Sequence, residues 1–81
     1  MIKLPRDVSG EQLAKALTKL GYTAVRQRGS HLTLATQQAG KHTLHVPMHQ
    51  YLKPGLLSSL LSQVQDHFGI SREQLIELLN L

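Results

Sequence analysis

Residues 22–35, Y-T-A-V-R-Q-R-G-S-H-L-T-L-A, decide the fold, because the chain stops following a helical pattern there. Two runs of β-favouring residues, 22–27 and 30–35, flank the dipeptide Arg28-Gly29. Two strands joined by two residues form a tight hairpin, and glycine supplies the positive φ that such a turn requires. The stretch therefore predicts an antiparallel hairpin at the centre of the chain.

Amphipathic helices are predicted on both sides of the strands. Serine and glutamine three residues apart form a capping box, which satisfies free backbone N–H groups at a helix start, and this spacing occurs twice. The predicted elements are, in chain order, a helix between Ser9 and Gly21, strands over 22–27, 30–35 and 42–46, a helix between Lys53 and Gly69, and a short helix opened by Ser71 to Gln74. Helices on one face of a small three-stranded antiparallel sheet give an α+β fold, αβββα with a short C-terminal helix. With 81 residues, the whole chain (1–81) is expected to form a single domain.

Composition and charge narrow the function classes. The chain has no cysteine, which excludes disulfides, thiolate metal sites and thiol catalysis. Its net charge of +4 is uneven, because residues 1–53 hold eight Lys and Arg against two acidic residues, while residues 54–81 hold one against three. This distribution favours a polyanionic partner, nucleic acid before membrane, although ordinary solvated lysines explain the charge equally well. Without a signal-peptide pattern or an apolar run of membrane-spanning length, a cytoplasmic location is expected.

Strand parity predicts which side chains leave the core. With Arg28-Gly29 as the turn, Arg26 opposes His31 and Val25 opposes Leu32, and opposed residues share a face. Val25, Leu32 and Leu34 are then expected in the core, and Arg26, His31 and Thr33 on the open face.

The third strand extends this open face. Pairing Leu34 with Leu44 puts Thr33 opposite His45, which lies diagonally from His31. At the turn, Arg28 and Ser30 flank the same face, and Gly29 lets a ligand approach the backbone closely.

His31 has competing interpretations. A merely exposed polar strand residue remains as probable as a functional one. A metal site is disfavoured, because His42 and His45 should face opposite sides of their strand. A catalytic triad and a catalytic pair of carboxylates are also disfavoured, because the chain contains no motif for either. Imidazole acid/base chemistry beside arginines suits RNA cleavage, in which the RNA 2′-hydroxyl supplies the nucleophile.

Several segments of the chain resemble the HicA toxin family. They are L-P-R-D-V-S-G (4–10), L-G-Y (20–22), V-R-Q-R-G-S-H (25–31), V-P-M-H (46–49), L-K-P-G (52–55) and G-I-S-R-E-Q-L (69–75). The resemblance implies a double-stranded-RNA-binding-like fold and a ribonuclease acting on mRNA as single-stranded RNA. It also implies His31 as the catalytic residue and inhibition by a HicB-like antitoxin. The chain departs from the family pattern in a longer 63–70 link and in His42 and His45.

The expected site therefore combines one catalytic residue, His31, with an RNA-binding set, and includes no metal and no cofactor. The RNA-binding set is Arg26, Arg28, Gly29, Ser30, His45 and Lys53. A non-catalytic RNA-binding module of the same fold is the alternative. A pure interaction domain, or one that acts only in antitoxin binding or DNA-bound regulation, is a second alternative. Residues 56–68 carry no Lys or Arg for a recognition helix, which argues against reading of the DNA major groove.

Overall fold

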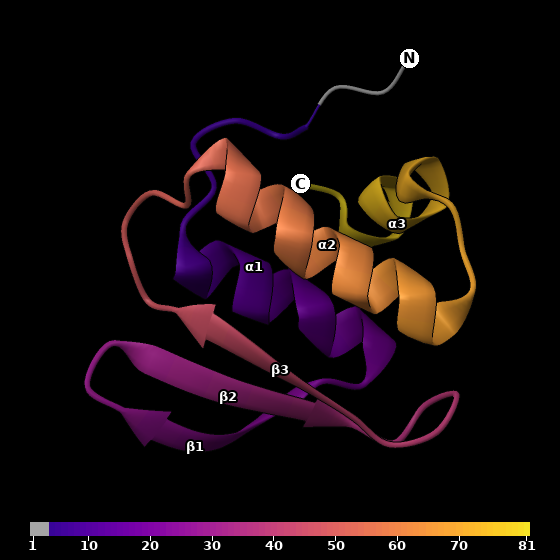
Figure 1. Ribbon diagram of the computed structural model, residues 1–81, viewed down its shortest axis with the longest axis horizontal. Helices are drawn as coiled ribbons and strands as arrows, with labels where there is room; N and C mark the ends of the chain where they lie inside the picture. Colours follow the sequence, from indigo (N-terminus) through magenta and orange to yellow (C-terminus); the bar gives the residue numbers. More distant parts are fainter. Residues whose placement is uncertain (1–3) are drawn as a thin grey trace.

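The computed structural model describes residues 4–81, which form one layer of helices on one face of a three-stranded sheet (Figure 1). The elements are α1 (Gly10–Leu17), the 3-10 turn η1 (Thr18–Leu20), β1 (Thr23–Arg28), β2 (His31–Thr36), β3 (His42–Pro47), α2 (Pro54–Phe68) and α3 (Arg72–Leu79). The strands are antiparallel in the order β1-β2-β3. The predicted αβββα arrangement with a short last helix is confirmed. Within residues 4–81, no helix has both the length and the apolar character needed to cross a membrane.

Both predicted capping boxes are present. The Ser9 hydroxyl accepts a hydrogen bond from the Gln12 backbone N–H at 3.0 Å, and Ser71 accepts one from Gln74 at 3.1 Å. In each case the glutamine side chain returns to the serine backbone N–H. These bonds satisfy donors that a helix start leaves unpaired, which is why α1 and α3 begin where the sequence predicts.

The helices cover the sheet unevenly. The helices α1 and α2 contact β3, whose Leu44 and Val46 are fully buried, whereas all six residues of β1 are exposed. Burial therefore rises from β1 to β3, and β1 is an edge strand that no helix covers.

The pairing of β1 with β2 differs from the predicted register. The turn residues are Gly29 and Ser30, so Arg28 pairs with His31, and the ladder shifts at Val25 between Ala24 and Arg26. Such a β-bulge adds one residue to a strand and bends it. Arg26 therefore lies opposite Thr33 rather than His31.

Val25 was predicted to lie in the core, and this prediction is wrong. It is 60% exposed, because the bulge removes it from the ladder and β1 has no helix above it. The predicted pairs between β2 and β3 are confirmed: Leu34 pairs with Leu44, and Thr33 pairs with His45.

The C-terminal helix is fastened to α2. The Arg72 guanidinium donates to Gln65, Ser58 and Ser62, all on α2, and Leu75 and Leu79 of α3 are buried. Residues 63–68, part of the link expected to be unusually long, continue α2 to Phe68, and Gly69 ends the helix at φ 66°.

Candidate functional site

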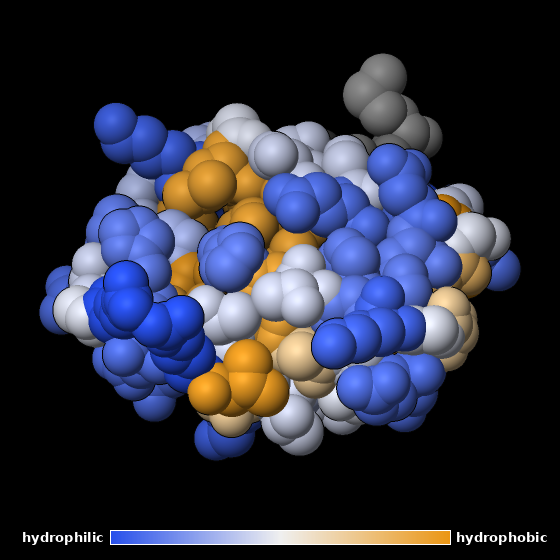
Figure 2. Space-filling view, turned by 60° about the horizontal axis from the view of Figure 1, so that its bottom comes forward, coloured by the Kyte–Doolittle hydropathy of each residue, from blue (hydrophilic) through white to orange (hydrophobic). Residues whose placement is uncertain are grey.

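The open face of the sheet gathers most of the predicted site. Arg28 faces His31 across the β1–β2 ladder, and Arg26 faces Thr33 two pairs further along, on the same face. His31, Arg26 and Arg28 are all exposed. Figure 2 turns this side forward and shows strongly hydrophilic side chains over the hairpin end of the sheet, beside a strip of hydrophobic atoms. The register beside the turn therefore puts both arginines on the face of His31.

The hairpin turn is open to a ligand. Gly29 adopts φ 56°, and a Cβ built there would meet no atom within 4 Å, so the backbone at this point is free to approach another molecule. The Ser30 carbonyl accepts a hydrogen bond from the Met48 N–H at 2.5 Å. This bond ties the turn to the loop that follows β3.

That loop brings a second histidine to His31. The rings of His31 and His49 lie edge to face, with centroids 6.5 Å apart, and both residues are exposed. The His49 carbonyl accepts from the Gly10 N–H at 2.9 Å, so the first turn of α1 holds the loop in place. A Cβ at Gly10 would lie 1.9 Å from the Pro47 oxygen, which explains why glycine stands at this contact.

His49 is the functional candidate that the sequence reasoning missed. Strand parity does not extend past Pro47 into an irregular loop, so it could not assign a direction to His49. The available signal was its position two residues after Pro47, because Pro47 pairs directly with His31.

The remaining predicted residues are placed differently. His45 lies on the open face, and its Nδ1 shares a 3.2 Å hydrogen bond with Thr33 Oγ1, two pairs along the ladder from His31. Lys53 is the N-cap of α2. The start of α2 belongs to the helix layer, so Lys53 is not part of the group on the sheet (Figure 1).

His42 belongs to a separate cluster on the helix side of the sheet. Its Nδ1 shares a 2.8 Å hydrogen bond with the buried Tyr22 hydroxyl, and its ring stacks on His67 at 4.5 Å. Burial, and secondarily the charge of His67, lowers the pKa of His42. The prediction that His42 and His45 face opposite sides of β3 is confirmed.

Taken together, the open face can hold and act on a phosphate. Two guanidinium groups can bind its oxygens, exposed backbone at the turn can approach it, and two imidazoles lie within reach of one small group. Among residues 4–81, no group of three or more His, Cys, Asp or Glu side chains is placed to bind a metal ion.

Comparison with protein families identifies this arrangement. Residues 10–65 match the family model described as "HicA toxin of bacterial toxin-antitoxin", a range that includes the whole sheet as well as His31, His45 and His49. Comparisons with curated proteins and with solved structures give no significant match. Because the family match spans more than half of the chain, the protein belongs to the HicA toxin family, the toxins of bacterial toxin–antitoxin systems, and has a cognate antitoxin as its partner.

Proposed function

We propose that the protein is an endoribonuclease that cleaves mRNA in single-stranded regions, in the cytoplasm, with His31 as a catalytic residue. The observation that carries this proposal is the exposed His31 ring, with Arg28 directly across the ladder and His49 at 6.5 Å. Family membership supports a toxic activity, and the basic open face supports a polyanionic substrate.

The chemistry needs only the RNA and these side chains. One imidazole accepts the proton of the 2′-hydroxyl as its oxygen bonds to the adjacent phosphorus. The other imidazole donates a proton to the 5′-oxygen as the phosphorus–oxygen bond to it breaks. The products are a 2′,3′-cyclic phosphate and a free 5′-hydroxyl. Histidine suits both roles because its ordinary pKa lies near neutral pH.

The arginines supply the charge for this step. Arg26 and Arg28 lie on the same face as His31 and are exposed, so their guanidinium groups can bind phosphate oxygens in pairs. Donors that meet charge developing on the phosphorane lower the barrier, and the accessible backbone at Gly29 and Ser30 adds to them. His45 is already bonded to Thr33 and contributes to RNA binding.

The antitoxin is proposed to be HicB-like and to cover this face. An antitoxin that covers the open face would block RNA binding and would also neutralise the positive charge of this face.

Cleavage of a labelled RNA tests the proposal. His31→Ala and His49→Ala should each lower the rate by about 10²–10⁴-fold, the usual contribution of an acid or base. His45→Ala, an exposed histidine on the same face, is the matched control and should lose less. All three histidines are exposed, so the free energy of unfolding of each variant should stay within about 0.5 kcal/mol of the wild-type value.

Two substrate conditions check the mechanism. Cleavage should persist in EDTA, and a single 2′-deoxy nucleotide at the cut should block it. Wild-type rates in His31→Ala would remove the catalytic assignment. RNA binding without any cleavage by the wild-type protein would establish the alternative, a non-catalytic RNA-binding module.

A further inference from the structure

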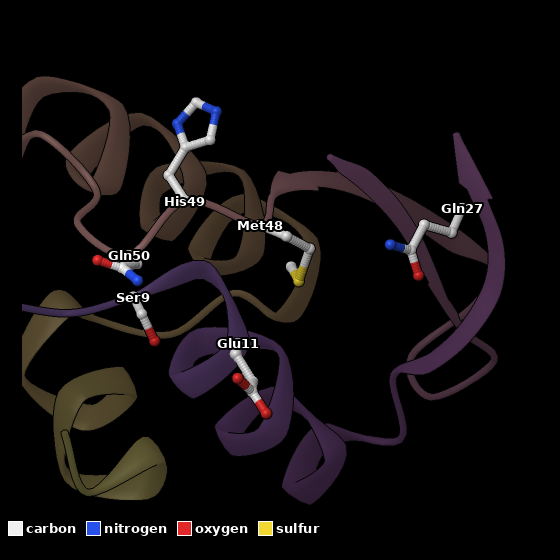
Figure 3. A pocket seen from close by; sticks show the side chains of 6 residues that line it. All are labelled: Ser9, Glu11, Gln27, Met48, His49 and Gln50. Atoms are coloured by element: carbon white, nitrogen blue, oxygen red, sulfur yellow. The ribbon is translucent and has the colours of Figure 1, made fainter. Parts of the chain in front are cut away.

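A pocket adjoins the His31–His49 pair on the side facing α1. It has a volume of about 520 Å³ and is lined by Ser9, Glu11, Gln27, Met48, His49 and Gln50 (Figure 3). This volume lies within the usual range for small-molecule sites, about 300–1,000 Å³. The pocket lies between Gln27 of the exposed strand β1, the start of α1 and the loop after β3.

The walls of the pocket combine an apolar surface with hydrogen-bonding groups. Gln27 reaches from β1 toward the Met48 side chain, and Glu11 lies on α1 on the other side of it (Figure 3). The Gln27 amide nitrogen donates to the Gly29 carbonyl at 3.2 Å, which orients the amide and leaves its oxygen available. Glu11 is exposed, so its carboxylate can rotate toward a bound molecule.

The loop after β3 connects the pocket to the proposed cleavage site. His49 lines the pocket, and its ring points away from Glu11 (Figure 3). The centroid of this ring lies 6.5 Å from that of His31. Met48, the residue before His49, donates a backbone hydrogen bond to Ser30 in the β1–β2 turn. A nucleotide whose phosphate lies between the two histidines therefore has this pocket beside it.

From this arrangement we propose that the pocket binds the nucleobase next to the cut phosphate and selects bases that carry an exocyclic amino group. This inference rests on the proposed cleavage. Unpaired bases in RNA are recognised by packing on a side chain and by hydrogen bonds along their Watson–Crick edge. Met48 provides the packing surface, since its thioether is polarisable and packs well against rings.

The carboxylate of Glu11 sets the preference, because it only accepts hydrogen bonds. Guanine, adenine and cytosine each offer an amino group to such an acceptor. Uracil instead presents two carbonyl oxygens on either side of its single N–H, and these repel a carboxylate. RNA with uracil at the selected position should be cut more slowly, by about fivefold or more, because one such contact discriminates between bases by at least about that factor.

The two capping boxes provide a matched control for Glu11. Glu11 and Glu73 occupy the same position in the first turn of α1 and α3, two residues after the N-cap serine, but only Glu11 lines the pocket. Glu11→Gln should reduce the discrimination against uracil, because an amide both donates and accepts. Glu73→Gln should leave it unchanged, although it alters the charge at a helix start in the same way. The measurement is the relative cleavage rate of four RNAs that differ only at the nucleotide beside the cut.

A binding experiment separates this proposal from the cleavage proposal. The His31→Ala protein is titrated with the 3′-monophosphates of the four nucleosides, and the side-chain N–H signals of Gln27, Gln50, Arg26 and Arg28 are followed by NMR. Guanosine, adenosine and cytidine monophosphates should shift both amides more than uridine monophosphate. Shifts confined to Arg26 and Arg28, or an unchanged base preference in Glu11→Gln, would overturn the pocket assignment even if His31 proved catalytic. If wild-type protein does not cleave RNA, the cleavage proposal fails and the titration still decides the pocket.

Discussion

His31 and His42 are the first residues of neighbouring strands, yet their surroundings give them different properties. His31 is exposed on the open face beside two arginines, where a substrate phosphate can reach it. His42 faces the helices, where it is bonded to Tyr22 and stacked on His67. Of these two histidines, His31 is the one on the open face, where RNA is proposed to bind, so the chemistry is proposed for His31 and a structural role for His42.

The structural role of His42 predicts a pH-dependent stability. Burial lowers the pKa of His42 in the folded protein below its ordinary value of 6.5, so the unfolded chain binds its proton more readily. The contribution of neutral His42 to the free energy of unfolding is therefore fully present above pH 6.5. It is lost as the pH falls through that value toward the lowered pKa of the folded state. Tyr22, whose pKa burial raises to about 12, stays neutral throughout.

Urea unfolding between about pH 5 and 8 measures this effect. The wild-type free energy of unfolding should fall on the acid side, and His42→Gln should reduce that fall. His45→Gln, at an exposed position of the same strand, controls for other groups that titrate in this range. An identical pH dependence in wild type and His42→Gln would contradict the assignment.

At the scale of elements, strong local signals made most of the fold predictable. Capping boxes fixed the starts of α1 and α3, and Gly21 and Gly69 ended helical segments with positive φ. Alternation of apolar residues fixed the faces of β2 and β3, because one side of each strand packs against the helices.

The register of β1 was not predictable in the same way. A strand that no helix covers has no core to impose alternation, so its residues T-A-V-R-Q-R carry no clear face. The dipeptides Arg28-Gly29 and Gly29-Ser30 are both acceptable turns, and the sequence cannot separate them. His49 escaped prediction for a related reason, since its place depends on loop contacts to Gly10 and Ser30 rather than on periodicity.

The bulge leads to a test by substitution. Val25 and Leu34 were both expected in the core, but Val25 is 60% exposed and Leu34 only 2%. Val25→Thr keeps a β-branched side chain and should change the free energy of unfolding by less than about 0.5 kcal/mol. Leu34→Ala leaves a cavity and should cost about 2–5 kcal/mol. Urea unfolding of the two variants distinguishes the registers, and a loss of a few kcal/mol in Val25→Thr would favour a straight β1 with Val25 in the core.

At the scale of the whole molecule, the basic and acidic excesses of the chain lie on different elements. The strongly basic part of the chain, residues 1–53, contains the entire sheet, and the acidic excess lies in residues 54–81, which form α2 and α3. RNA and the antitoxin are therefore proposed to compete for the same surface, because each must match the charge of the open face.

Two double variants with equal loss of charge test this competition in a His31→Ala background. Arg26→Ala with Arg28→Ala removes two cations from the open face, whereas Lys15→Ala with Lys41→Ala removes two exposed cations from α1 and the 37–41 loop. The logarithm of the binding constant for single-stranded RNA falls linearly with the logarithm of the salt concentration, and each lost phosphate contact should reduce the steepness of this slope by about 0.7. The arginine pair should therefore reduce it by roughly 1.4. The same pair should weaken binding of the cognate antitoxin. If the lysine pair has the larger effect on RNA, the RNA path runs along the helix side; if only antitoxin binding survives the arginine changes, inhibition does not act by covering the open face.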